Sequence, residues 1–166
     1  MNLYLVRHGD ALARGKGLAS DADRVLSKQG EEDARRAGKL LSRVDPAIAL
    51  VLTSPALRAT DTGRLIAEEL PGRPEVKASE RLKPGARIDD ILNEAVAAGR
   101  GSIVAVGHQP DLGTLIAWLV ADQGPASFSL PPGTVACVEM QPDIEFPRAS
   151  LRWLAPPDLM RQLPLE

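Results

Sequence analysis

Residues 3–10 of the chain read LYLVRHGD, an apolar run that passes directly into arginine, histidine and glycine. A short apolar run ended by glycine predicts a buried strand over residues 2–6. The carboxyl end of such a strand is where open α/β sheets place their ligands. At that position the neutral imidazole of His8 can attack an electrophile, and the guanidinium of Arg7 can hold an anion. We therefore expect phosphoryl chemistry on a histidine.

Strands and helices alternate along the rest of the chain. Apolar runs predict further strands over residues 48–52, 75–77, 102–106, 134–140 and 150–154, the last two separated by a turn at 142–143. Helical spacing predicts helices over residues 29–44, 56–70, 88–98 and 112–120, with one more turn in 156–166. Ser27 is a suitable N-cap, and the small, polar residues 10–25 indicate a loop. The alternation predicts a three-layer α/β/α fold with a mostly parallel central sheet and an antiparallel edge.

Length and composition fit one cytoplasmic domain spanning residues 1–166. The net charge of −2 argues against broad electrostatic binding to nucleic acid or to an anionic membrane. Cys137 is the single cysteine and lies in an apolar run, which indicates a buried thiol in a reducing compartment. The apolar run over residues 3–6 is too short for a signal-peptide core or a membrane span.

Three of the predicted strands are followed by polar residues, and this pattern predicts one site shared by all three. Arg7 and His8 follow the first strand, Arg58 opens the helix after the second, and His108 follows the strand over 102–106. Because the carboxyl ends of parallel strands share one edge of the sheet, we expect these four residues to meet. Two arginines and two histidines suit a tetrahedral dianion with one nucleophile beside it. Gly9 and Ser54 are further candidates for binding this anion, although capping of the following helix is the role we favour for Ser54.

Four stretches of the chain resemble the histidine phosphatase superfamily, also called phosphoglycerate-mutase-like. They are RHG at 7–9, LSKQG at 26–30, SPALRATDT at 54–62 and VGH at 106–108. Their order and spacing cover most of residues 1–120. RHGDA at 7–11, GHQP at 107–110 and the short length are most similar to the SixA-type phosphohistidine phosphatases.

This resemblance implies a phosphoglycerate-mutase-like fold and a role for each candidate residue. His8 would attack phosphorus and become a phosphohistidine, while Arg7, Arg58 and His108 would hold the equatorial oxygens. Water would then release inorganic phosphate. No cofactor is implied, and two histidines with one cysteine offer no ligand set for a transition metal.

The proton donor is left open by the sequence. Many members of the superfamily use a glutamate, and histidine acid phosphatases place an aspartate directly after the second histidine. In this chain Gln109 follows His108 directly, so the acid-phosphatase pattern is not present. Glu80 lies in roughly the right region for the glutamate, and a solvated loop charge is its alternative interpretation. A missing acid favours a phosphoramidate substrate, because its P–N bond breaks readily once the imidazole is protonated.

We therefore expect a metal-independent phosphatase that works through phospho-His8 on a phosphohistidine-bearing protein. The short connection between Arg58 and His108 leaves no room for a lid domain, which favours a site open to a folded substrate. A small phosphomonoester, such as a sugar or nucleotide phosphate, is the alternative substrate for the same mechanism. A mutase, which must retain its product, and a phosphate-recognising module without turnover fit less well. We expect no nucleic-acid or membrane partner.

Overall fold

The computed structural model describes residues 1–13, 20–97, 101–121, 128–140 and 149–165 of the chain. A six-stranded sheet with the order β3-β2-β4-β1-β5-β6 forms its centre. The strands are β1 (Asn2–Arg7), β2 (Ile48–Thr53), β3 (Glu75–Ala78), β4 (Ser102–Gly107), β5 (Val135–Met140) and β6 (Ala149–Ala155). Strands β1 to β4 pair in parallel, whereas β5 is antiparallel to both β1 and β6. The predicted sheet, mostly parallel with an antiparallel edge, is confirmed.

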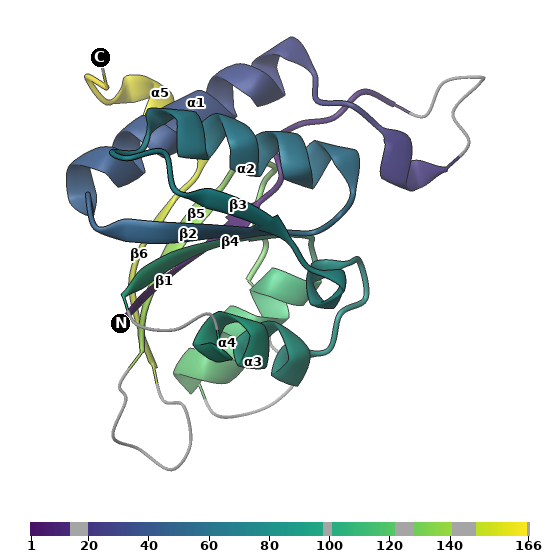
Figure 1. Ribbon diagram of the computed structural model, residues 1–166, viewed down its shortest axis with the longest axis vertical. Coiled ribbons are helices and arrows are strands. Elements are labelled where there is room, and N and C mark those ends of the chain that lie inside the picture. Colours follow the sequence, from purple (N-terminus) through teal and green to yellow (C-terminus); the bar gives the residue numbers. More distant parts are fainter. Residues whose placement is uncertain (14–19, 98–100, 122–127, 141–148, 166) are drawn as a thin grey trace.

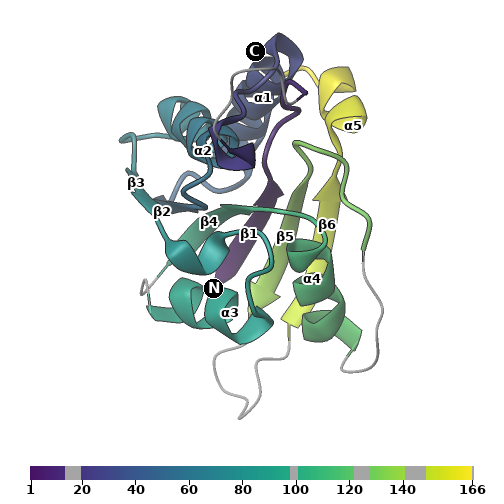
Figure 2. The same cartoon turned by 90° about the vertical axis from the view of Figure 1, so that its right-hand side faces the viewer.

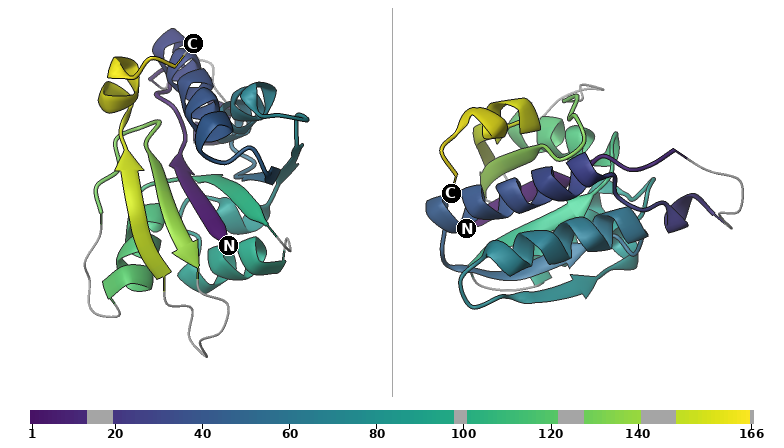
Figure 3. Two further views of the ribbon diagram at one scale, coloured as in Figure 1. Left: turned by 90° about the vertical axis from the view of Figure 1, so that its left-hand side faces the viewer. Right: turned by 90° about the horizontal axis from the view of Figure 1, so that it is seen from above.

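Helices cover both faces of this sheet, which gives the predicted three layers (Figures 1 and 3). One face carries α1 (Lys28–Val44), α2 (Leu57–Glu69) and α5 (Pro157–Gln162), and the other carries α3 (Ile88–Ala97) and α4 (Asp111–Ala121). Successive side chains of β1 alternate between the two cores, as a strand buried on both faces requires. Leu3 and Leu5 join the α3–α4 core, while Tyr4 and Val6 join the α1–α2 core. Within the described residues, no helix is long and apolar enough to cross a membrane.

The predicted strands and helices are present, and their ends differ only slightly from the prediction. The loop predicted over residues 10–25 contains more structure than its composition indicated. Ala11 and Leu26 form an isolated β-bridge, and Asp21–Asp23 form the 3₁₀ helix η1. Residues 14–19 and the turn predicted at 142–143 lie outside the described residues.

Helix α1 begins at a close contact with the backbone that follows β1. Ser27 is its N-cap, as predicted, and the Ser27 hydroxyl accepts a hydrogen bond from the Gly30 amide at 3.1 Å. A Cβ atom on Gly9 would lie 2.7 Å from the Gly30 carbonyl oxygen. A Cβ atom on Gly30 would overlap the Asp10 carbonyl oxygen. Only hydrogen fits between the two segments, so these glycines let α1 approach the turn that carries His8.

Replacing Gly30 with alanine tests this contact. Alanine ordinarily stabilises a helix by about 1 kcal/mol relative to glycine. Here we expect Gly30→Ala to lower the free energy of unfolding by about 1–3 kcal/mol, because the new methyl group overlaps fixed backbone. Urea denaturation measures the change. Glu32→Ala, on the exposed side of the same helix, is the control and should change stability by less than about 0.5 kcal/mol. A Gly30→Ala protein as stable as the parent would contradict the packing argument.

Candidate active site

The structure brings Arg7, His8, Arg58 and His108 to the carboxyl edge of the sheet. This edge lies on the right in Figure 1 and faces the viewer in Figure 2. Arg7 ends β1, His8 follows it, and His108 follows the neighbouring strand β4. Arg58 reaches the same place from the first turn of α2. All four residues line one cavity of about 350 Å³, which we call the phosphoryl pocket.

The ring of His8 is held as a neutral imidazole with a defined lone pair. Its Nδ1 lies 2.8 Å from the Gly9 carbonyl oxygen, and its Nε2 lies 3.1 Å from Nε of Arg58. A guanidinium nitrogen can only donate, so Nε2 accepts and the ring proton resides on Nδ1. Burial lowers the pKa of His8 to about 4, aided by the positive charges of Arg58, Arg7 and Arg24. Nε2 is thus unprotonated throughout the neutral pH range.

His108 lies beside His8 with the two ring centroids 5.1 Å apart. Its Nε2 is 2.8 Å from the hydroxyl oxygen of Ser54, and that oxygen accepts a hydrogen bond from the Ala56 amide. Burial, followed by the charges of His8 and Arg58, lowers the pKa of His108 to about 3. Both histidines are therefore neutral at pH 7, and the positive charge of the pocket comes from its arginines.

The two predicted arginines are buried to different degrees and have different partners. Arg58 is 4% exposed and donates from Nη1 to the Asp21 carbonyl oxygen at 2.7 Å and from Nη2 to the Asp21 carboxylate at 2.9 Å. Arg7 donates from Nη1 to the Leu130 carbonyl oxygen at 2.5 Å. Among the described residues its buried Nε has no hydrogen-bond partner, and burial lowers the pKa of Arg7. A phosphoryl oxygen would supply the acceptor that this nitrogen lacks.

Two lining residues, Arg24 and Asp21, were not found by the sequence analysis. Arg24 donates to the carbonyl oxygens of Leu12 and Ala11, which fixes it beside the bridge between Ala11 and Leu26. Partial burial works to raise the pKa of Asp21, but the charge of Arg58 and hydrogen bonds from both arginines outweigh it and hold that pKa below its usual range. The sequence contains one signal for this pair. Asp21 and Arg24 are three residues apart, a spacing at which acidic and basic side chains interact on a helical turn.

The remaining predicted site residues lie around the phosphoryl pocket and do not line it. Gly9 donates from its amide to Thr62, and Ser54 contacts His108 from behind, so both act through the scaffold. Ser54 does not cap the helix as favoured from the sequence. Because α2 begins at Leu57, after Pro55, Ala56 is its N-cap, and this cap has no side-chain hydrogen bond. Glu80 lies in an adjoining pocket, where it pairs with Lys83.

Comparisons with known proteins identify the family of this chain. The model of the histidine phosphatase superfamily (branch 1) matches residues 3–84. An uncharacterized protein of Picosynechococcus sp. (strain ATCC 27264 / PCC 7002 / PR-6) is 37% identical over 117 residues, which cover 68% of this chain and 69% of the relative. The chain belongs to the histidine phosphatase superfamily.

SixA proteins are among the superfamily relatives of this chain. Phosphohistidine phosphatase SixA of Escherichia coli (strain K12) is 31% identical over 138 residues, covering 78% of this chain and 80% of that protein. The solved structure of the protein histidine phosphatase SixA complexed with tungstate superposes with a TM-score of 0.78 and 26% identity, covering 95% of this chain and 98% of that chain. The resemblance to SixA-type enzymes drawn from the motifs is confirmed, and the chain is a phosphatase of the superfamily.

The two histidines give a direct test of the electrostatics, because the chain has no others. In NMR titrations of the free protein we expect neither ring to titrate near the ordinary pKa of about 6.5, and both to remain neutral down to pH 5. Single variants His8→Asn and His108→Asn assign the two sets of signals. A midpoint above pH 6 for His8 would contradict the neutral, buried ring.

The same shifts make stability depend on pH with a defined sign. The unfolded chain takes up protons on its histidines as pH falls below about 6.5, whereas the folded rings do so only near pH 4 and 3. The stability that the two neutral histidines contribute is therefore complete above pH 6.5 and is lost as pH falls. The free energy of unfolding then decreases by up to about 1.4 kcal/mol per pH unit for each histidine. Urea denaturation between pH 7 and 4.5 measures this slope. The double variant should flatten it, and an equal slope in parent and variant would refute the assignment.

Proposed function

We propose that this chain, with residues 1–166 as one catalytic domain, removes phosphoryl groups from phosphohistidine on a protein. The observation that carries the proposal is the ring of His8, held neutral with its Nε2 lone pair beside Arg58 in a cavity of arginines. A phosphoryl dianion is attracted to such a cavity, and the lone pair is the nucleophile that it meets there.

The chemistry requires two transfers of the phosphoryl group. In the first, Nε2 of His8 forms a bond to phosphorus while the bond from phosphorus to the substrate breaks. In the second, water attacks phospho-His8, and inorganic phosphate leaves as the Nε2 lone pair is restored. Arg7, Arg58 and His108 would hold the equatorial oxygens, where most of the transition-state charge lies. The unsatisfied Nε of Arg7 and the third arginine, Arg24, support the same charge requirement.

Two observations support a protein phosphohistidine as substrate. The SixA proteins similar to this chain are named as phosphohistidine phosphatases and protein histidine phosphatases. In addition, Glu80, the candidate acid of the sequence, pairs with Lys83 in the adjoining pocket and does not line the phosphoryl pocket, which suits a leaving group that needs no strong acid. A small phosphomonoester handled by the same histidine is the alternative that the experiment must separate.

The decisive experiment measures phosphate release from a histidine-phosphorylated protein beside a panel of sugar and nucleotide monophosphates. We expect preferential release from phosphohistidine and its loss in His8→Ala, which lacks the nucleophile. Faster release from one monoester would keep the mechanism and replace the proposed substrate. Undiminished release by His8→Ala would overturn the mechanism itself.

Arg58→Ala tests the contribution of this guanidinium to catalysis and anion binding in the same assay. We expect kcat/KM to fall by about 10²–10³, because a donor to the transition-state oxygens is lost. The inhibition constant of tungstate should rise as well, since the same guanidinium holds the ground-state anion. The matched control is Cys137→Ala, whose thiol is buried on β5 and is not part of the pocket lining. A folded Cys137→Ala protein without activity would contradict a histidine nucleophile.

Chelation tests the absence of a metal step. Within the described residues, no group of three or more His, Cys, Asp or Glu side chains is placed to hold a metal ion. We expect EDTA to leave phosphate release unchanged, because arginines supply the positive charge. Loss of activity in EDTA with recovery on adding a divalent cation would refute this account.

A further inference from the structure

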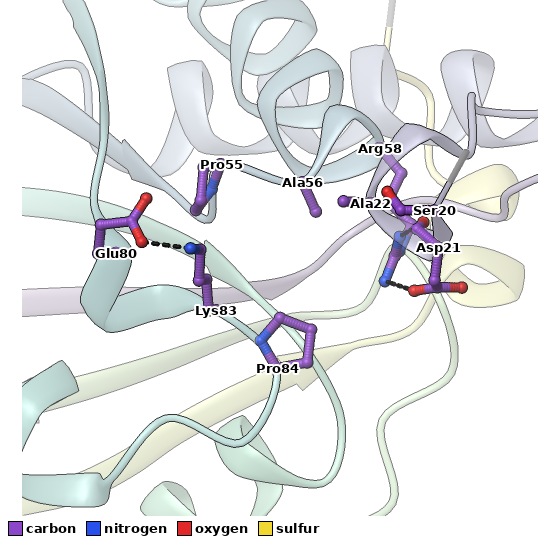
Figure 4. A pocket seen from close by; sticks show the side chains of 9 residues that line it. All are labelled: Ser20, Asp21, Ala22, Pro55, Ala56, Arg58, Glu80, Lys83 and Pro84. Atoms are coloured by element: carbon purple, nitrogen blue, oxygen red, sulfur yellow. Dashed lines mark hydrogen bonds and ion pairs between the residues drawn. The ribbon is translucent and has the colours of Figure 1, made fainter. Parts of the chain in front are cut away.

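A second cavity of about 580 Å³ adjoins the phosphoryl pocket. The two cavities share Asp21, Arg58 and Pro84 as lining residues, so they lie side by side at the buried arginine. Figure 4 shows Arg58 and Asp21 at one end of this cavity and Glu80 and Lys83 at the other. Its lining consists of Ser20, Asp21, Ala22, Pro55, Ala56, Arg58, Glu80, Lys83 and Pro84. A phosphoryl group held by Arg58 therefore has space beside it for the group to which it is attached.

The walls between these two ends are small and apolar. Pro55 and Ala56 come from the turn before α2, Ala22 comes from η1, and Pro84 follows η2 (Glu80–Leu82). Proline rings and alanine methyl groups present surfaces without hydrogen-bond donors. Such surfaces suit a flat ring, which can replace water there without leaving a polar group unsatisfied.

The charges of the cavity are balanced by pairs within it. The Lys83 ammonium pairs with Glu80, and the Arg58 guanidinium pairs with Asp21 at 2.9 Å. Among the described lining residues, no positive charge lacks a carboxylate partner, so a second anionic group on the substrate gains little here. Because both signs are paired, the cavity favours a group without a net charge of its own.

We propose that this cavity, the leaving-group pocket, holds the imidazole ring of the substrate's phosphohistidine while the phosphoryl group lies in the phosphoryl pocket. The proposal rests on the function proposed above. In the transfer, the Nε2 lone pair of His8 forms the new N–P bond, and the electrons of the old N–P bond return to the substrate ring. That ring carries a proton on its other nitrogen, so it leaves as neutral imidazole. Attacking and leaving groups are then the same chemical group, and the step needs no strong acid.

Filling the pocket tests the proposal with two small substrates. Phosphoimidazole places a ring in the leaving-group pocket, whereas phosphoramidate releases ammonia, which is too small to reach the apolar walls. Ala22 is exposed, so Ala22→Trp can fill the cavity without disturbing the core. We expect kcat/KM for phosphoimidazole to fall by about tenfold or more, with phosphoramidate changed by less than about twofold.

The matched control is Ala47→Trp, a site that is also exposed, precedes β2 and so lies at the opposite edge of the sheet. It should leave both substrates unaffected. Equal losses on both substrates in Ala22→Trp, or no loss on either, would overturn the leaving-group pocket. His8→Ala keeps the two hypotheses apart, because its loss of activity on phosphoramidate tests the nucleophile without involving the pocket.

The paired charges give an independent test. Glu80→Gln releases Lys83 from its partner, so we expect fructose 1,6-bisphosphate to gain at least about threefold in kcat/KM relative to phosphoimidazole. Lys83→Gln removes the cation and should lower the same ratio. The ratio cancels a general loss of activity in either variant. If both variants shift the ratio in one direction, or neither shifts it, charge pairing does not exclude anionic leaving groups from this cavity.

Discussion

The hydrogen bond from Arg58 Nε to His8 Nε2 is the interaction on which the site depends. It commits a guanidinium to a lone pair, and this arrangement exists only while the imidazole is neutral. The same bond requires Arg58 to be buried, and a buried guanidinium needs acceptors for its other nitrogens. Asp21 supplies both its carbonyl oxygen and its carboxylate. The 3₁₀ turn η1 is therefore part of the site, although it lies far from β1 and α2 in the sequence.

The scaffold holds this bond in place through backbone contacts. The His8 amide donates to the Gly107 carbonyl oxygen, which ties the end of β1 to the end of β4. Thr62 accepts from the Gly9 amide and donates to the Arg58 carbonyl oxygen, so one side chain links the turn after β1 to α2. Because Gly9 and Gly30 have no side chains, the backbone of α1 packs directly against the same turn. Three elements thus fix a ring that is displaced if any one of them moves.

The sequence predicted what depends on local pattern. Strands buried on both faces are continuous apolar runs, and polar residues at their carboxyl ends share an edge, so Arg7, His8 and His108 could be assigned to one place. Arg24 and Asp21 could not, because their positions arise from a bridge between Ala11 and Leu26 that no periodicity reports. Ser54 was assigned to the wrong partner for a similar reason. Whether a serine caps a helix depends on where that helix begins, and Pro55 and Ala56 delay this start.

The low basicity of His8 affects the two transfers differently. An imidazole in solution has an ordinary pKa near 6.5, so the proposed substrate ring, once released, holds a proton more readily than the buried ring of His8. The proton therefore stays with the departing ring, and the neutral His8 ring remains the acceptor of phosphorus. In the second transfer His8 is itself the leaving group, and a weakly basic imidazole leaves phosphorus more easily than a strongly basic one. Burial of one histidine thus keeps its ring unprotonated for the proposed first transfer and eases its release from phosphorus in the second, which favours turnover rather than storage of the phosphoryl group.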